Sequence, residues 1–349
     1  MKFSILIPVY NAQKYVDTCL RTLTEMCDHE IVVVDDGSKD ETGAICDRYA
    51  EQFPDRVKVI HQENHGQLSS RCNAIKAATG DYVIFLDVDD ALEPDIFDIL
   101  TDIIKRHNEP DMVIYSFYYD EDGKLRESEP LYEGEKEFSG EEKKELYKKF
   151  FTATKLNNVW TKAVKRTVFD GEYPDYNKYA KLRCAEDKLH SMGMMTNAER
   201  IVYTDKPLYR YKLVADSVTR RFTVDAIDRF NTTAMYGEQL AYIGKWGLEM
   251  PEWKLRLNAG YIHSAIWTLD QFYYKVKTKA EREEVLRYDW QAFVPAGCAE
   301  NFKDNPYISS AVKDIYAMLT NRNYSGLKRH FFKKKLSNKL KTIKRKLIK

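Results

Sequence analysis

The first half of the chain alternates short apolar runs with stretches of helical spacing. The apolar runs cover residues 3–9, 30–34, 57–60, 82–86 and 112–118. Because these runs are short and nearly continuous, they are typical of strands that are buried on both faces. Strands separated by helices of roughly ten to fifteen residues predict an α/β fold, in which helices cover both faces of a mostly parallel, Rossmann-like sheet.

Local signals place helices between these strands. Ser38 and Glu41 form the S-x-x-E pattern of a capping box, which predicts that a helix starts there. A further helix over about residues 68–79 is expected to end at Gly80. Pro94 is expected to open the next helix, because proline is favoured in the first turn.

The pattern divides the chain into three regions. Residues 1–220 carry the alternating α/β pattern, and helical periodicity with many aromatic residues dominates residues 221–325. Residues 326–349 place apolar side chains on one helical stripe, with lysines on the other faces. The stripe consists of Leu327, Phe331, Phe332, Leu336, Leu340, Ile343 and Leu347.

The composition suits a soluble globular protein, since 44% of the 349 residues are hydrophobic and 31% are charged. No stretch reaches the roughly 18 to 20 apolar residues that a membrane-spanning helix needs. We read the first ten residues as a strand and not as a signal peptide. The six cysteines are scattered without a C-x-x-C pair, which favours reduced thiols in a cytoplasm over disulfides or a zinc site.

The net charge of +1 hides an asymmetry between the body of the chain and its end. Twelve of the 55 basic residues, but none of the 54 acidic residues, lie beyond Asp314, so the first 314 residues carry −11 and the rest +12. A basic helix with an apolar stripe is expected to lie on an anionic membrane surface. The alternatives are a disordered tail and a nucleic-acid partner. We expect no nucleic acid, because no recognition motif supports it.

Acidic and aromatic residues mark the ends of three predicted strands. The segments are Pro8-Val9-Tyr10, Asp35-Asp36 and Asp87-Val88-Asp89-Asp90. In a parallel sheet these ends share one edge, and ligands bind beyond that edge. Carboxylates crowded on such an edge suit a hard divalent cation, Mg²⁺ or Mn²⁺.

Two phosphate-handling classes share part of this pattern. IVVVDDGS and VIFLDVDD resemble the acidic pair and the phosphorylated aspartate of a receiver domain, but a full strand and helix precede the pair. Phosphatases of the haloacid-dehalogenase type place Thr or Val two residues after their D-x-D motif, where this chain has Ala91. The phosphate-binding patterns G-x-x-x-x-G-K-[ST] and G-x-G-x-x-G are absent from the sequence.

Four segments, in order, resemble the motifs of one enzyme family. They are SILIPVYNAQKYVDTCLRTL, EIVVVDDGSKDET, NHGQLSSRCNAIKAATGDYVIFLDVDDALEPD and AEDKLHSMG. Over about residues 1–220 the chain is similar to the family 2 glycosyltransferases, which have the GT-A fold. The resemblance implies metal-dependent, inverting transfer of a hexosyl or N-acetylhexosaminyl group from a nucleotide sugar, with UDP as the expected nucleotide. A phosphate-handling domain and a non-catalytic nucleotide-sugar-binding relic stay as alternatives.

The resemblance assigns donor-side roles to several residues. Tyr10 is expected to stack on the nucleobase beside Pro8 and the backbone of Val9. Asp36 is expected to accept a hydrogen bond from the ring N–H, since an ionised carboxylate can only accept. Arg71 is expected to approach the base or ribose of the donor.

The resemblance also assigns the acids after the fourth strand. Asp89 is the expected metal ligand, Asp87 binds the ribose or a metal-bound water, and Asp90 supports them. The expected cation, Mn²⁺ or Mg²⁺, stabilises the departing nucleoside diphosphate. The family often completes the metal shell with a later histidine. Near that place this chain has Arg210 and Lys212, which are expected to neutralise the diphosphate unless water and phosphates complete the shell.

On the acceptor side, Asp187 is the expected general base and Glu186 the second candidate, because direct displacement needs one base opposite the leaving group. Trp160 and Lys162 resemble a family element near the acceptor. The expected acceptor is a glycan or a lipid-linked molecule in capsule, exopolysaccharide or other cell-surface glycan synthesis. The enzyme is expected in the cytoplasm, on the inner face of the cell membrane.

Overall fold

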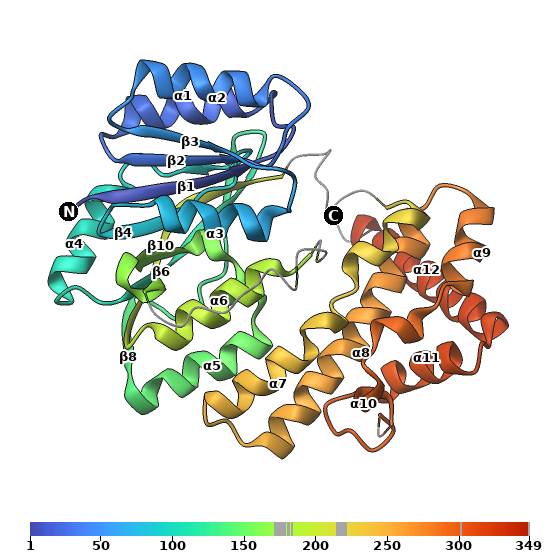
Figure 1. Cartoon of the computed structure of the whole chain (residues 1–349). Helices are drawn as coiled ribbons and strands as arrows, with labels where there is room; N and C mark the ends of the chain where they lie inside the picture. Colours follow the sequence, from blue (N-terminus) through green and yellow to red (C-terminus); the bar gives the residue numbers. More distant parts are fainter. Residues whose placement is uncertain (171–178, 180–181, 183, 214–221, 301, 348–349) are drawn as a thin grey trace. The chain divides into compact units, whose positions relative to one another are not determined.

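The computed structural model describes residues 1–170, 179, 182, 184–213, 222–300 and 302–347 (Figure 1). Of residues 336 and 338–347 the backbone alone is described. The chain divides into two units, Met1–Val218 and Thr219–Lys349. The three-part division expected from the sequence pattern stays a prediction.

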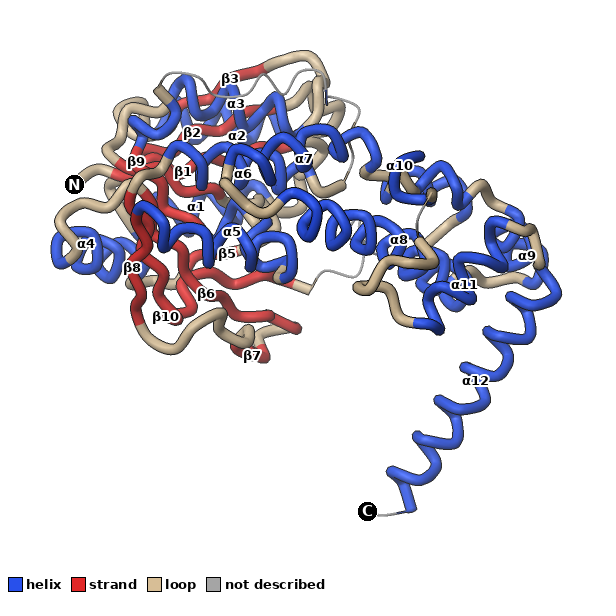
Figure 2. The backbone as a smooth tube through the Cα atoms, turned by 90° about the horizontal axis from the view of Figure 1, so that it is seen from below, coloured by secondary structure: helices blue, strands red, loops and turns tan. Residues whose placement is uncertain are grey.

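Unit Met1–Val218 is built on one sheet of ten described strands (Figure 2). The strands are β1 (Phe3–Val9), β2 (Glu30–Asp35), β3 (Val57–His61), β4 (Tyr82–Phe85), β5 (Ala91–Leu92), β6 (Met112–Glu121), β7 (Lys124–Glu127), β8 (Glu135–Ser139), β9 (Lys162–Lys165) and β10 (Arg200–Lys212). They follow the order β3-β2-β1-β4-β9-β6-β10-β5, with β7 beside β6 and β8 beside β10.

The strands β3, β2, β1 and β4 form a parallel block. Every residue of β1, β2 and β4 is buried, which explains why these segments show no polar alternation in the sequence. β9 runs antiparallel between β4 and β6, so the whole sheet is mixed. The predicted α/β architecture is confirmed, although β9 was not predicted, because two lysines flank its short apolar centre.

Helices cover both faces of the sheet (Figure 1). The helices are α1 (Val16–Met26), α2 (Thr42–Gln52), α3 (Gln67–Ala77), α4 (Ile96–Arg106), α5 (Lys143–Thr152) and α6 (Glu186–Asn197). Apolar residues of α1, α2 and α4 share one core with alternate residues of β1, β2 and β4. On the opposite face α3 packs on β1 and β2, and α6 packs beside α3.

The C-terminal ends of the long strands share one edge of the sheet. β9 is antiparallel to both β4 and β6, and β10 is parallel to β6, so β1, β2, β4, β6 and β10 all point the same way. The three acidic and aromatic segments that the sequence placed at strand ends therefore lie along one edge. This edge is the place where open α/β sheets bind their ligands.

The predicted capping box at Ser38 is wrong. Helix α2 begins four residues later, at Thr42, and Asp40 accepts a hydrogen bond from the Thr42 backbone N–H at 3.0 Å. The Ser38 hydroxyl instead accepts a hydrogen bond from the Asn11 backbone N–H at 2.9 Å. Ser38 thus links the ends of β1 and β2 along the ligand edge, a long-range contact that a local pattern does not contain.

Gly80 has a packing role and does not end the helix before it. Helix α3 ends at Ala77, and Gly80 lies directly against β1. A Cβ at this position would lie 2.8 Å from the backbone N of Ser4 and 2.8 Å from the carbonyl C of Phe3. The chain can pass this close to β1 only because glycine has no side chain.

Unit Thr219–Lys349 is helical in its described residues. Its α-helices are α7 (Tyr236–Lys245), α8 (Met250–Lys275), α9 (Lys279–Arg287), α10 (Ala296–Ala299), α11 (Ser310–Thr320) and α12 (Tyr324–Leu347). The predicted helical C-terminal region is therefore confirmed. Among the described residues, no helix is long and apolar enough to cross a membrane.

The basic helix α12 begins inside its own unit and then extends past the other helices of that unit (Figure 2). Leu327 and Phe331 are buried, and the Phe331 ring stacks on Tyr273 at 4.2 Å between ring centroids. These two positions of the expected membrane stripe are therefore occupied by packing, whereas Phe332 is 69% exposed. The structure describes only the backbone of the residues that are expected to continue the stripe, which are Leu336, Leu340, Ile343 and Leu347.

Candidate active site

The loop after β4 sends its three aspartates to different partners. The buried Asp90 carboxylate accepts hydrogen bonds from the Tyr209 hydroxyl at 2.7 Å and from the Lys212 backbone N–H at 2.8 Å. The Tyr209 oxygen in turn accepts a hydrogen bond from the Asp87 backbone N–H at 3.2 Å. Burial, together with the charges of Asp87 and Asp89, raises the pKa of Asp90 well above its usual value. Asp90 therefore fastens the loop to β10.

The Asp87 side chain turns toward α3. Its Oδ1 accepts hydrogen bonds from Nε2 of Gln67 and from Nη2 of Arg71, both at 3.2 Å. Burial raises the pKa of Asp87 to about 6, against the opposing effect of the Arg71 charge. A carboxylate held in this way would gain from a further cation, because its charge is only partly balanced.

Arg71 lies at the centre of a cluster of carboxylates. Its side chain is 1% exposed. Nη2 binds Asp87, Nη1 donates a short hydrogen bond to Oδ1 of Asp187, and Nη1 lies 3.8 Å from Oε1 of Glu186. Burial lowers the pKa of Arg71, but the three negative charges outweigh this and hold the pKa above its ordinary value. The buried Nε has no hydrogen-bond partner among the described residues.

Asp187 and Glu186 form the first turn of α6, where the helix dipole favours negative charge. The residue before them, Ala185, has a φ of +63°, a left-handed conformation that turns the chain into the helix. The second oxygen of Asp187 accepts a hydrogen bond from the Val159 backbone N–H at 3.5 Å. Burial and the adjacent charge of Asp187 raise the pKa of Glu186 to about 7. The structure thus brings both predicted base candidates to Arg71 and Asp87.

The expected nucleobase side lies at the ends of β1 and β2. Tyr10 is 50% exposed. The Val9 carbonyl, next to Pro8 in β1, accepts a hydrogen bond from the Asp36 backbone N–H at 2.9 Å. The buried Asp36 carboxylate accepts hydrogen bonds from Gln62 Nε2 and from two backbone N–H groups, those of residues 65 and 66. Asp36 therefore holds the loop before α3 in place and keeps capacity for one further donor.

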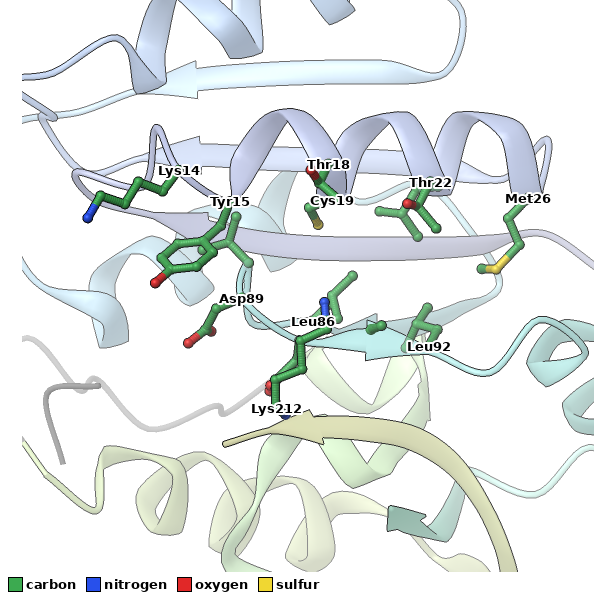
Figure 3. A pocket seen from close by; sticks show the side chains of 14 residues that line it. Lys14, Tyr15, Thr18, Cys19, Thr22, Met26, Leu86, Asp89, Leu92 and Lys212 are labelled. Carbon is green, nitrogen blue, oxygen red and sulfur yellow. Dashed lines mark hydrogen bonds between the residues drawn. The ribbon is translucent and has the colours of Figure 1, made fainter. Parts of the chain in front are cut away.

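Asp89 faces a different space from Asp87. It lines a cavity of about 140 Å³ between α1 and the loop after β4, with Tyr15 on one side and Lys212 on the other (Figure 3). Lys14 also lines this cavity, whose inner wall is apolar. Burial raises the pKa of Asp89, and the positive charge of Lys212 opposes this rise. Arg210 and Lys212 were both expected to neutralise the diphosphate, and Lys212 lies beside Asp89.

The other residues expected near the acceptor or the diphosphate are already engaged. Trp160 is buried and stacks on Tyr209 at 4.5 Å and on Tyr211 at 5.5 Å between ring centroids. Lys162 is fully buried, and its ammonium donates to the carbonyls of residues 156 and 158. Direct contact of Lys162 with an acceptor is therefore incompatible with its position. Arg210 forms a two-bond ion pair with Glu93 through Nε and Nη2 of its guanidinium.

Sequence reasoning missed the residues that connect the predicted ones. Gln67 binds Asp87, and Tyr209 links the Asp87 backbone to Asp90. Gln67 lies in the NHGQ segment of the third quoted motif, four positions before Arg71, so helical spacing alone would have placed both on one face of α3. Tyr209 lies more than 110 residues from its partners, and nothing in the local pattern connects it with them.

The carboxylates after β4 fit a divalent cation in part. Among the described residues, no group of three or more His, Cys, Asp or Glu side chains is arranged to hold a metal ion. Asp87 and Asp89 nevertheless offer two carboxylates whose pKa values are raised by burial. Hard cations that keep several waters and bind substrate phosphates need only one or two protein carboxylates. The donor set therefore fits Mg²⁺ or Mn²⁺ if water and diphosphate oxygens supply the other ligands.

Comparison with known proteins shows the family. The family model described as glycosyl transferase family 2 matches residues 4–169. The uncharacterised glycosyltransferase EpsJ of Bacillus subtilis is 30% identical over 247 residues, which is 70% of each chain. The putative glycosyltransferase EpsH of the same organism is 28% identical over 274 residues, 77% of each chain.

A solved structure shares the fold. Residues 1–349 of Staphylococcus aureus TarS, solved in complex with UDP-GlcNAc, match with a TM-score of 0.62 at 22% identity, over 93% of this chain and 89% of that one. At this identity the match concerns the fold alone, and it covers both the sheet and the helical region. Together with the family match, these relatives show that the chain belongs to glycosyltransferase family 2 and is a glycosyltransferase with the GT-A fold.

Proposed function

We propose that this glycosyltransferase moves a sugar from a UDP-sugar to a hydroxyl of a glycan or lipid-linked acceptor, with inversion and with a divalent cation. One observation carries the proposal. The acids after β4, which face the ligand edge, and the acids that open α6 meet at a single buried arginine. Transfer by direct displacement needs such a pair of sites, one for the leaving diphosphate and one for a base that activates the attacking hydroxyl.

The donor side is supported by the ends of β1 and β2. Tyr10 offers an exposed ring for the nucleobase, and Asp36 has capacity for one hydrogen bond from the ring N–H. The TarS structure holds UDP-GlcNAc, and TarS is named a poly(ribitol-phosphate) beta-N-acetylglucosaminyltransferase. These facts support a UDP-sugar as donor and a cell-surface glycan as the product of this chain.

For the diphosphate we propose Asp89 as the principal metal ligand, while Asp87, which turns toward α3, holds the ribose or a metal-bound water. A cation bound there would offset the negative charge that develops on the departing diphosphate. Lys212, which lines the same cavity as Asp89, adds a positive charge on that side. Asp90 keeps the loop in place from behind through Tyr209 and the Lys212 backbone.

For the acceptor we propose Asp187 as the general base. Its carboxylate would take the proton of the acceptor hydroxyl while that oxygen forms the bond to the anomeric carbon and the bond to the diphosphate breaks. Because attack and departure occur on opposite faces, the anomeric configuration inverts. Glu186 is the second candidate, and burial together with the adjacent Asp187 charge raises the pKa of Glu186, which opposes its ionised form.

Titration of the protein with UDP, with and without Mn²⁺, tests the donor side. Wild type is expected to bind UDP tightly only when Mn²⁺ is present. In Asp89→Ala, Mn²⁺ is expected to have no effect on the affinity for UDP. Labelling of Asp87 by beryllofluoride or acetyl phosphate would instead identify a phosphate-handling domain and overturn the proposal. UDP binding without turnover of any UDP-sugar would identify a non-catalytic relic.

Release of UDP from a panel of UDP-sugars tests the base. Asp187→Asn is expected to bind UDP like wild type and to lose turnover. Asp98→Asn is the matched control, since Asp98 is an exposed acid in the first turn of α4, and it is expected to turn over normally. Full turnover by Asp187→Asn would reject Asp187 as the base.

We also propose that the C-terminal helix places the enzyme on the inner face of the cell membrane. The +12 charge beyond Asp314 and the exposed Phe332 support this. The full-length protein is expected to float with phosphatidylglycerol vesicles, to remain unbound with neutral vesicles, and to dissociate at high salt. Equal behaviour with both vesicle types would contradict an electrostatic membrane site.

A further inference from the structure

We propose that Arg71 is a positioning residue for the reaction, which holds the Asp187 carboxylate in a fixed place relative to Asp87. This inference rests on the proposed role of Asp187 as the base. It differs from the role that the sequence suggested for Arg71, which was contact with the base or ribose of the donor. In the structure the guanidinium is buried, and its two terminal nitrogens are taken up by carboxylates from two different segments.

Arg71 connects two acids that lie far apart in the sequence. Asp87 follows β4 and Asp187 opens α6, and these segments are 100 residues apart in sequence. Arg71 on α3 donates to Asp87 through Nη2 and to Asp187 through Nη1. A planar guanidinium fixes the angle between two such bonds, whereas a lysine ammonium is a point charge on a flexible stem. One side chain thus sets the distance between the donor-side acid and the proposed base.

Arg71 also contacts the two acids of α6 unequally. Glu186 and Asp187 are adjacent carboxylates in a largely buried place, and two such groups resist being ionised together. Arg71 donates a hydrogen bond to Asp187 but approaches Glu186 only to 3.8 Å. The guanidinium therefore binds the Asp187 carboxylate directly and leaves Glu186 outside hydrogen-bond distance. This unequal contact fixes the place of the Asp187 carboxylate and not that of Glu186, as the proposed role of Asp187 requires.

A buried histidine on α6 adds no positive charge near Arg71. His190 is fully buried on α6, one turn after Glu186, and burial followed by the Arg71 charge lowers the pKa of His190 to about 3. The imidazole is therefore neutral and places no second positive charge against the guanidinium. In the described residues, the ion-pair partners of Arg71 are all acids of the candidate site.

The test is Arg71→Lys in the full chain, assayed by UDP release from the UDP-sugar that wild type turns over fastest. A misplaced base is expected to lower kcat by about 100-fold, while the KM for the donor changes by less than about threefold. A rise in KM with unchanged kcat would overturn the inference and restore a donor-binding role. Unchanged kcat and KM would overturn it as well.

Arg106→Lys is the matched control, because Arg106 bridges Asp102 and Glu135 on a different part of the unit. It is expected to leave kcat unchanged, so a general loss from any broken arginine bridge would be recognised. If Arg71→Lys does not fold, Asp187→Glu gives the second test. That variant keeps a carboxylate but moves it by one methylene, and wild-type kcat in this variant would overturn the inference.

The failure of this inference is distinguishable from the failure of the proposed function. If wild type releases no UDP from any sugar donor, the proposed function fails before Arg71 is tested. If wild type turns over and Asp187→Asn does not, the base is supported and the Arg71 variants alone decide.

Discussion

Removing one hydroxyl, in Tyr209→Phe, is expected to loosen the acid loop of the candidate site. The hydroxyl donates to the Asp90 carboxylate at 2.7 Å and accepts from the Asp87 backbone N–H at 3.2 Å. It is the only side-chain link that the described residues show between β10 and both of these residues. The phenylalanine ring would keep the stacking on Trp160, so the change isolates the two hydrogen bonds.

The expected loss of stability follows from the hydrogen bonds that Asp90 and the Asp87 backbone N–H lose. A hydrogen bond to a charged group contributes about 1.5 to 3 kcal/mol, and a buried N–H left without a partner costs about 1 to 3 kcal/mol. Asp90 keeps its bond from the Lys212 backbone, and relaxation recovers part of the loss. We therefore expect the free energy of unfolding to fall by about 2 to 4 kcal/mol. This is a large share of the 5 to 15 kcal/mol that stabilises a typical protein.

The assay is urea unfolding followed by fluorescence, in which the midpoint shifts while the slope stays constant. Tyr119→Phe is the control, because the Tyr119 ring also packs in this aromatic group, against Phe117 and Tyr211, and its hydroxyl has no hydrogen bond among the described residues. UDP binding with Mn²⁺ is expected to weaken about tenfold in Tyr209→Phe, or about 1.4 kcal/mol. A loss of stability below about 0.5 kcal/mol with unchanged UDP binding would refute the reasoning.

Three further changes probe other features of the fold. Gly80→Ala is expected to lower the free energy of unfolding by about 1 to 3 kcal/mol, because the added methyl meets the β1 backbone at 2.8 Å; an unchanged urea midpoint would show that the chain can shift there. The hydrogen bonds to Asp47 and then to Asp35 raise the pKa of His61 in the folded protein. The charged imidazole therefore stabilises the fold at pH values below the histidine pKa of the unfolded chain, which is about 6.5. This stabilisation is lost as the pH rises through the pKa of the folded state. His61→Gln should therefore cost more at about pH 6 than at about pH 9, and an equal cost at both would contradict the ion pairs. Thr278→Ala removes the capping box of α9 and is expected to lower the melting temperature through a loss of about 1 kcal/mol.

The parts of the fold that could be predicted are those that depend on local pattern. β1, β2 and β4 are buried on both faces, so their apolar runs predicted both the strands and the edge where they end. β9 escaped prediction because lysines occupy its two ends. One of these, Lys162, is fully buried and donates to backbone carbonyls. Burial lowers the pKa of Lys162 to about 7, and hydropathy cannot foresee a buried lysine of this kind.

In the candidate site, too, local motifs predicted the residues, whereas packing determined their contacts. Motif order placed Asp87, Asp187 and Arg71 in one site, but no spacing rule says which of them touch. The resemblance suggested that Arg71 meets the donor, whereas the structure gives its terminal nitrogens to carboxylates. Contacts between side chains after β4, on α3 and on α6 depend on how the three elements pack. This packing is determined by many residues along the whole chain, so no single motif predicts it.

The separation of the acids after β4 explains how one short loop can serve both sides of a transfer reaction. Asp87 turns to Arg71 and through it to the proposed base, Asp89 faces the cavity beside Lys212, and Asp90 is held by Tyr209. If all three carboxylates pointed the same way, one cation would have to offset the repulsion among them. Directed apart, each meets a different positive or donating group, and the loop becomes a rigid link between leaving group and base. A change that frees the loop should therefore disturb donor binding and base placement together, whereas a change at Arg71 leaves the bonds of the loop to Tyr209 and Lys212 in place and should disturb mainly the base.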